Sequence, residues 1–335
     1  MAYFLGSSEL KFLMPAPLEK STQLPFDVAP GIWGVKDVFV NFYFIESREQ
    51  NSWVLVDTGL KSSLAPILRI SKLLFSNQLP AAIILTHAHF DHVGALRELL
   101  LRWHVPVYVH RMELPYLRGV SAYPPPDPCA GGGLMSLSSF LYPRGPINVG
   151  NFVNALPDDH SVPGLPDWEW MATPGHSPGH ISLFRPADKV LLAGDAFVTT
   201  KAESVISICQ QRLIVSGPPK YFTCDWAAAE SSVKKLAALQ PETAATGHGM
   251  PMKGSKLKTQ LQTLITHFRQ LAVPKHGRYT NRPALSDEEG VLYVPPPSKR
   301  QIMARYILGA GLLAAGALAV YWKGKKRKLI QQTVA

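Results

Sequence analysis

Three histidines and one aspartate fall within six residues of this chain, directly after a short apolar run. Residues 81–85 (AAIIL) have the composition of a strand, and residues 86–92 then read THAHFDH. A turn at a strand–helix junction lets alternate side chains converge, which a regular helix or strand would not allow for all four. Imidazole and carboxylate together suit zinc, and also iron or manganese. We therefore expect a metal site, formed by His87, His89, Asp91 and His92.

Three further candidate ligands stand at similar places later in the chain. His176, Asp195 and His248 each follow a short apolar run, and each has a glycine next to it. Loops at the ends of strands of one sheet edge can bring their side chains to one point, and glycine permits close approach of the backbone. Together with residues 86–92, these three junctions are a specific signal for a metal centre.

Short apolar strands alternate with amphipathic helices along the body of the chain. We expect strands over 38–45, 52–56, 81–85, 105–109, 168–172, 181–184, 190–193 and 243–246, and helices over 62–75, 93–103, 225–239 and 256–271. Asp225 is the expected N-cap of the third helix. This order of elements predicts an α/β fold.

Residues 114–166 interrupt the pattern. This segment is rich in proline and glycine, and aromatic and aliphatic side chains that need cover are interleaved with them. An irregular connection of this length in a compact domain is usually either a functional lid or a disordered segment. We expect an ordered, partly mobile lid that shapes the pocket and excludes water.

The chain resembles the metallo-β-lactamase superfamily from about residue 38 to residue 248 and the helix that follows. The resemblance rests on five matched positions in order, namely Asp57-Thr58-Gly59, the motif at 87–92, His176, Asp195 and His248. It implies a four-layer αβ/βα sandwich with two central mixed sheets.

The resemblance also implies roles for the ligands. It implies that one metal is bound by His87, His89 and His176, and the second by Asp91, His92 and His248. Asp195 would bridge the two metals. Asp57 either accepts a hydrogen bond from a ligand imidazole or is a turn residue at a strand end. His180 either supports the ligands or stabilises its own loop. We expect two zinc ions, with iron or manganese as alternatives.

The expected reaction is hydrolysis of an ester, thioester or lactone by a metal-bound hydroxide, with Asp91 or Asp195 relaying a proton to the leaving group. Asp195 matches thioesterase, lactonase and RNA-processing relatives, whereas antibiotic-hydrolysing relatives commonly have cysteine there. Val198 stands where acyl-homoserine-lactone hydrolases usually have tyrosine. A hydroxyl that substitutes for it would come from Tyr123, Tyr142, Thr199 or Thr200. Two alternatives stay open: an iron-dependent oxidoreductase similar to persulfide dioxygenases, and a non-catalytic binding module.

The net charge of +10 belongs to the C-terminus rather than to the body. From residue 298 onward there are eight basic residues and no acidic ones, so residues 1–297 carry 26 basic and 24 acidic side chains. A nearly neutral body offers little attraction to nucleic-acid phosphates. We therefore expect a small-molecule substrate and no nucleic-acid partner.

Residues 306–322 (YILGAGLLAAGALAVYW) contain no charge and are bracketed by Arg305 and Lys323. As a helix they would span about 26 Å, enough for a thin hydrocarbon core, with aromatic residues at both interfaces. We expect a single-pass membrane anchor whose small residues permit self-association. The body is expected in the cytoplasm because no secretory signal precedes it, although the basic flanks favour the opposite orientation.

The chain thus divides into five parts. These are an N-terminal extension (1–37), a hydrolase domain (38–274) with the lid insertion (114–166), a linker (275–305), a transmembrane helix (306–322) and a basic tail (323–335).

Overall fold

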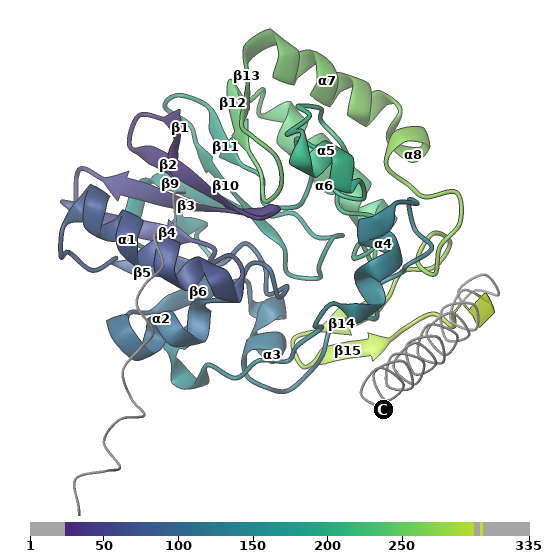
Figure 1. Cartoon of the computed structure of the whole chain (residues 1–335), viewed down its shortest axis with the longest axis horizontal. Coiled ribbons are helices and arrows are strands. Elements are labelled where there is room, and N and C mark those ends of the chain that lie inside the picture. The colour runs from purple at the N-terminus through teal and green to yellow at the C-terminus, as the bar shows by residue number, and fades with distance from the viewer. Residues whose placement is uncertain (1–23, 298–301, 304–335) are drawn as a thin grey trace, which may run out of the picture.

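The computed structural model describes residues 24–297 and 302–303, and its core is a pair of β-sheets with helices on both outer sides (Figure 1). The first sheet contains, in spatial order, β1 (Phe26–Ala29), β2 (Ile32–Asp37), β3 (Val40–Ser47), β4 (Ser52–Val56), β5 (Ala82–Ile84), β6 (Val107–Val109) and β7 (Val153–Ala155). The second contains β13 (Met252–Lys253), β12 (Thr243–Ala245), β11 (Val190–Leu192), β10 (Ile181–Arg185), β9 (Leu165–Ala172) and β8 (Ser161–Val162).

Both sheets are mixed, as the resemblance implied. β1 to β4 pair antiparallel and β4 to β7 pair parallel. In the second sheet only the β11–β12 pair is parallel. The helices are α1 (Leu64–Phe75), α2 (Leu96–Trp103), α3 (Leu114–Leu117), α4 (Leu134–Ser138), α5 (Val205–Cys209), α6 (Trp226–Ala238), α7 (Gly254–Thr266) and α8 (Phe268–Leu271).

Three apolar layers hold the four structural layers together. One lies between the first sheet and α1 and α2, a second between the two sheets, and a third between the second sheet and α6 and α7. β3 shows how one strand serves two of them: Phe42 and Phe44 face the helices, while Tyr43 and Ile45 face the other sheet. This arrangement is the αβ/βα sandwich that the resemblance implied.

The sheets extend beyond the boundaries read from the sequence. β1 and β2 lie within 1–37, which was predicted to be an extension, and they pair with the edge of the first sheet. β7 and β8 lie within the predicted lid, so its boundary at residue 166 is too late. These strands are two to six residues long, and a strand that short shows little periodicity.

The predicted linker also contains regular structure. β14 (Leu285–Asp287) and β15 (Gly290–Tyr293) form a hairpin. The hairpin is attached to the body, because the backbone N–H of Val291 donates to Ser121 Oγ and Tyr116 lies at hydrogen-bond distance from Ser286.

Asp225 caps α6 as expected, and its carboxylate accepts the backbone N–H groups of Ala227 and Ala228 at 3.0 Å. The predicted membrane helix at 306–322 lies outside the described residues. Within 24–297 and 302–303, none of the helices has the length and apolar character needed to cross a bilayer.

Candidate metal centre

Four loops from the two sheets meet at one edge of the sandwich, and together they carry every predicted ligand. Residues 86–92 follow β5 in the first sheet, whereas His176, Asp195 and His248 follow β9, β11 and β12 in the second. Hydrogen bonds fix the loops to one another across the sheets. The backbone N–H of Ile181 donates to the carbonyl of Thr86 at 2.9 Å, for example.

The seven predicted ligands are buried and form three groups whose potential ligand atoms lie within 4.8 Å of one another. The groups are His87, His89 and His176; His87, His92 and Asp195; and Asp91, His92 and His248. The first and third are the two ligand sets that the resemblance implied, and the second contains the expected bridge.

Asp195 lies at the centre of this cluster. Its Oδ2 atom is 3.1 Å from His248 Nε2, 3.4 Å from His176 Nε2 and 3.7 Å from His92 Nε2. One carboxylate oxygen therefore contacts imidazoles of both ligand sets. Asp91 Oδ2 is more peripheral, with His248 Nε2 3.6 Å away.

The potential ligand atoms of the cluster are not all satisfied by hydrogen bonds to one another, and their chemistry suits metal ions. His87 Nε2, His92 Nε2 and Asp195 Oδ1 are buried, and none has a hydrogen-bond partner in the described part of the chain. A buried polar atom left unpaired costs about 1–3 kcal/mol. Imidazole nitrogens and carboxylate oxygens are ligands of zinc and of other divalent transition metals. Metal coordination would satisfy all three atoms.

Burial keeps most of these imidazoles neutral, the form that binds metal. It lowers the pKa of His87 and His89 well below the usual value, helped by the neighbouring histidines, and lowers the pKa of His176 to about 3. Burial opposes a charge on Asp195, but His248 and His92 outweigh it and hold the pKa of the carboxyl well below its usual range. Burial likewise opposes a charge on His248, but Asp195 and Asp91 raise its pKa above the usual value. The cluster therefore combines an anionic carboxylate, two imidazoles in which a positive charge is favoured, and three that burial keeps neutral.

Asp57 supports a ligand imidazole. Its Oδ2 lies 2.8 Å from His92 Nδ1, and its Oδ1 accepts the backbone N–H of Thr86 at 2.8 Å. Burial opposes a charge on His92, yet Asp57 and Asp195 raise its pKa well above the usual value. The two carboxylates thus favour a cation at this point, which a metal ion on Nε2 would supply in place of a proton.

His180 holds the backbone of the bridging residue. The N–H of Asp195 donates to His180 Nε2 at 2.8 Å, and His180 Nδ1 lies 2.8 Å from Thr173 Oγ1. Burial lowers its pKa to about 4, so Nε2 is free to accept. The side chain therefore contacts the site and stabilises its own loop at once.

Two glycines are required by close packing around Asp195. A Cβ on Gly247 would lie 2.1 Å from Asp195 Oδ1, and a Cβ on Gly194 would lie 2.6 Å from His180 Nε2. Gly194 also has a positive φ of 53°. The glycines beside the predicted ligands thus have the close-approach role expected of them.

Glu113 is an important residue that the sequence did not reveal. It is fully buried just before α3, and it joins two ligand loops. One carboxylate oxygen accepts the N–H of Ala88 and the hydroxyl of Tyr123, and the other accepts Ser177 Oγ at 2.8 Å and the N–H of Gly179 at 2.7 Å. The carboxylate thereby sets the spacing between His87 and His89 on one loop and His176 on the other.

Aromatic rings pack beside the predicted ligands. Phe222 stacks on His89 with ring centroids 4.5 Å apart, and Phe39 stacks on His248 at 6.0 Å. Phe90 contacts Tyr142 at 5.4 Å, and Tyr142 also reaches Phe222 at 6.0 Å.

The four hydroxyls considered as substitutes for a tyrosine at 198 have different surroundings. Tyr123 is engaged by Glu113 and by the N–H of Ala88, and Thr199 Oγ1 donates to the carbonyl of Met250 at 2.7 Å. Thr200 Oγ1 is buried without a hydrogen-bond partner among the described residues. Tyr142 is half-buried and belongs to the lid. Its ring lies 5.4 Å from that of Phe90, the residue before Asp91.

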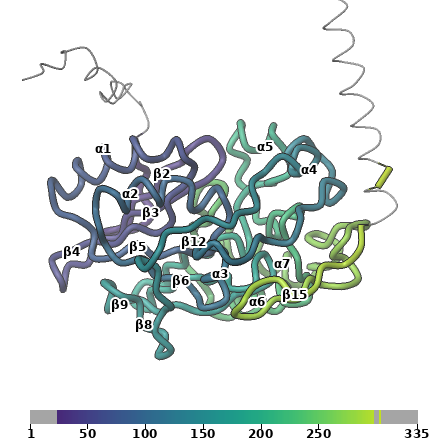
Figure 2. Tube along the Cα trace, turned by 90° about the horizontal axis from the view of Figure 1, so that it is seen from below, coloured from purple at the N-terminus to yellow at the C-terminus, as the bar shows by residue number. Residues whose placement is uncertain are grey.

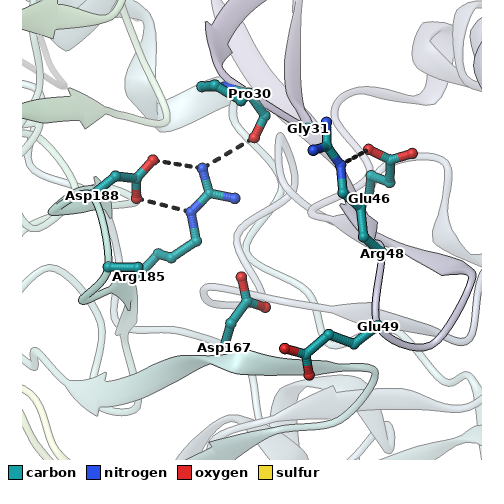
Figure 3. A pocket seen from close by; sticks show the side chains of 9 residues that line it. Pro30, Gly31, Glu46, Arg48, Glu49, Asp167, Arg185 and Asp188 are labelled. Carbon is teal, nitrogen blue, oxygen red and sulfur yellow. Dashed lines mark hydrogen bonds and ion pairs between the residues drawn. The ribbon is translucent and has the colours of Figure 1, made fainter.

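A surface hollow of about 340 Å³ lies at the opposite end of the sandwich. Its lining includes the β1–β2 and β3–β4 turns, and β4 runs from this end to Asp57. Arg185 is bonded to both oxygens of Asp188 and to the carbonyl of Pro30, and Arg48 pairs with Glu46 (Figure 3). These four side chains are held in pairs, and the carboxylates of Glu49 and Asp167 also line the hollow (Figure 3).

Substitution of Glu113 by glutamine should weaken metal retention. The amide keeps the volume but replaces one acceptor oxygen with a donor, which leaves Ala88 N–H and the Tyr123 hydroxyl, or Ser177 and Gly179 N–H, without an acceptor. Supporting groups of this kind typically contribute about 10–100-fold to metal affinity. Transfer of metal to a chelator should be faster by that factor than in the wild type. Exposed Glu288→Gln is the control, and equal transfer rates in both variants would contradict the role of Glu113.

Comparison with known proteins agrees with this geometry. The family model of the metallo-beta-lactamase superfamily matches residues 35–248. The probable metallo-hydrolase YflN of Bacillus subtilis (strain 168) is 46% identical over 248 residues, which is 73% of this chain and 94% of that protein. A hydroxyacylglutathione hydrolase of Pectobacterium carotovorum is 31% identical over 43% of each chain.

The fold comparison gives the same result. The crystal structure of a beta-lactamase domain protein from Burkholderia ambifaria matches with a TM-score of 0.51 and 19% identity, and the match covers 77% of this chain and 75% of that one. The family match, the relative at 46% identity and the shared fold lead to one conclusion. The chain belongs to the metallo-β-lactamase superfamily.

Proposed function

We propose that this protein is a dinuclear metal-dependent hydrolase that cleaves an acyl thioester or ester, or a lactone. The observation that carries the proposal is the convergence of seven buried ligands on one point, with three of their donor atoms unpaired. YflN, the relative at 46% identity, is named a probable metallo-hydrolase. The non-catalytic alternative is weaker, because the complete ligand set is present.

The residues of each metal position follow from the distances. His87, His89 and His176 would hold one ion, Asp91, His92 and His248 would hold the other, and Asp195 would lie between them. When bound, two such ions lower the pKa of water and polarise a carbonyl oxygen. We propose zinc, to which this set of nitrogen and oxygen ligands is suited.

The two carboxylates of the cluster have different surroundings. Asp195 Oδ2 is enclosed by three imidazoles. Among the described residues, the only ion-pair partner of Asp91 Oδ2 within 4.0 Å is His248. Asp91 also follows Phe90, whose ring contacts the lid residue Tyr142. We therefore assign proton transfer to the leaving group to Asp91, and the bridging position to Asp195.

The aromatic side chains beside the predicted ligands favour an apolar acyl group. Phe39, Phe90, Tyr142 and Phe222 present ring faces and edges beside the ligands. The relatives named hydroxyacylglutathione hydrolase act, by their name, on an acyl thioester. The substrate we place first is therefore a thioester or ester with an aliphatic acyl chain.

We further propose that residues 306–322 anchor the protein to a membrane, with the body on the cytoplasmic side and the small residues of the span available for helix pairing. The support is the uncharged 17-residue sequence with basic residues on both sides. Eight residues separate it from Pro297, where the described body ends.

Metal analysis of the purified full chain should give two zinc ions per chain. His89→Ala removes a ligand of one position, so it should lose metal and lower kcat/KM at least about a hundredfold, since even groups that only support a ligand contribute 10–100-fold. His276→Ala changes an exposed histidine and should alter neither value. Retention of full activity by His89→Ala would refute the proposed centre.

A matched substrate panel tests the reaction. A thioester and an oxygen ester with the same acyl chain, and a lactone of the same chain length, should all be hydrolysed. The thioester should be turned over fastest. A phosphodiester and a β-lactam should not react. Turnover of the phosphodiester alone, or iron in the isolated protein together with oxygen consumption, would show that the reaction is of another class.

Membrane fractionation tests the anchor. The full chain should remain with the membranes after an alkaline carbonate wash and be released by detergent, because a spanning helix is held by hydrophobic burial rather than by charge. A variant that lacks residues 306–335 should be found in the soluble fraction after the carbonate wash. Complete release of the full chain by carbonate would contradict the proposal.

A further inference from the structure

The outer face of the lid has the reverse of the usual burial pattern. In the α4 segment and the 3₁₀ turn that follows it (Ser139–Leu141), Ser136 and Ser139 are fully buried. The large apolar side chains point outward, with exposed fractions of 62% for Leu134, 44% for Leu137, 45% for Phe140 and 70% for Leu141. A segment that buries its serines and exposes its leucines suits an apolar environment on its outer side.

The neighbouring helix extends this apolar surface. α5 lies beside α4 in both views (Figures 1 and 2), and the N–H of Met135 approaches the carbonyl of Glu203 at 3.4 Å. Ile206 of α5 is 68% exposed. We call the combined surface the lid patch; it consists of Leu134, Leu137, Phe140, Leu141 and Ile206.

The inner side of the same segment reaches the metal centre. Tyr142 follows Leu141 directly, and its ring contacts Phe90, the residue before the predicted ligand Asp91. Its hydroxyl lies 2.9 Å from Ser138 Oγ. Apolar and aromatic side chains therefore run from Leu141 through Tyr142 and Phe90 toward the predicted ligand Asp91.

The two sequence segments that contain the lid patch are basic. Residues 130–150 and 199–221 contain one acidic side chain, Glu203. Their basic side chains are Arg144, Lys201, Arg212 and Lys220. An apolar surface with basic residues around it fits a bilayer with anionic headgroups better than it fits a second copy of the same basic surface.

The length of the chain beyond the body limits where the body can lie. Eight residues connect Pro297 to the uncharged segment that starts at residue 306, and nine extended peptide units reach at most about 30 Å. If that segment spans a membrane, the body is held at the membrane surface, within reach of it.

We propose that the lid patch inserts into the membrane interface, so that the metal centre receives an amphipathic acyl substrate directly from the bilayer. The insertion depends on the lid patch and the anchor. The substrate step rests on the proposed hydrolase function, and the two parts are tested by separate measurements.

Site-specific quenching tests the insertion. Leu141→Cys is labelled with bimane in a Cys209→Ser background, because Cys209 is exposed on α5, and the full chain is reconstituted into phosphatidylcholine–phosphatidylglycerol vesicles. Acyl-chain doxyl lipids should quench this label about twofold or more above the labelled background protein. Leu101→Cys on α2, which is 73% exposed and far from α4 in both views, is the matched control.

Equal quenching at 141 and 101 would overturn the proposal. Blue-shifted emission at 141 without quenching would also overturn it, because the lid patch would then be covered by protein, either a second copy or residues 306–322.

Kinetics test the substrate step. Leu134→Ser/Leu137→Ser/Leu141→Ser should lower hydrolysis of a long-chain acyl thioester in vesicles roughly tenfold, since interfacial binding scales with buried apolar area. The same triple variant should hydrolyse a short-chain, water-soluble thioester at the wild-type rate. The control variant Leu101→Ser should hydrolyse both substrates at the wild-type rate. Equal loss on both substrates would contradict delivery from the bilayer. If the wild type cleaves neither substrate while residue 141 is quenched, the hydrolase function fails and the insertion stands.

Discussion

A buried anionic carboxylate is the constraint around which this structure is arranged. Asp195 is almost fully buried and contacts three imidazoles through one oxygen, while its other oxygen has no hydrogen-bond partner within the described residues. Removing such a charge from water is costly unless cations or hydrogen-bond donors surround it. The loops from both sheets and the glycines that permit close approach serve the same end. So do the imidazoles, of which burial keeps three neutral while the carboxylates favour a positive charge on His92 and His248. Together they form a buried site that divalent cations would complete.

The sandwich supplies this site with ligands from two independent halves. The first sheet contributes the cluster at 87–92, and the second contributes one ligand after each of three strands. Residues between the halves then fix the geometry: Glu113 joins the loops of Ala88 and Gly179, and His180 holds the backbone of Asp195. Because these supports are fully buried, the spacing of the ligands is set before any substrate arrives.

The seven side chains that the structure brings together could be singled out from the sequence because their signals are local. Motif spacing and a glycine beside each later ligand are readable within a few residues, and the structure brings all seven side chains together. Glu113 left no such signal, since its partners Ala88 and Gly179 are 25 and 66 residues away. The short strands β1, β2, β7 and β8 were missed for a related reason: their stability comes from sheet pairing and not from their own periodicity. The outward-facing leucines of α4 likewise depend on tertiary packing.

We propose that two metal ions share the centre around Asp195. Anomalous X-ray scattering at the metal absorption edge, from crystals of the protein as isolated, measures this directly. Two peaks are expected, one among His87, His89 and His176 and the other among Asp91, His92 and His248, with the Asp195 carboxylate in contact with both. A single peak, or peaks away from Asp195, would contradict it.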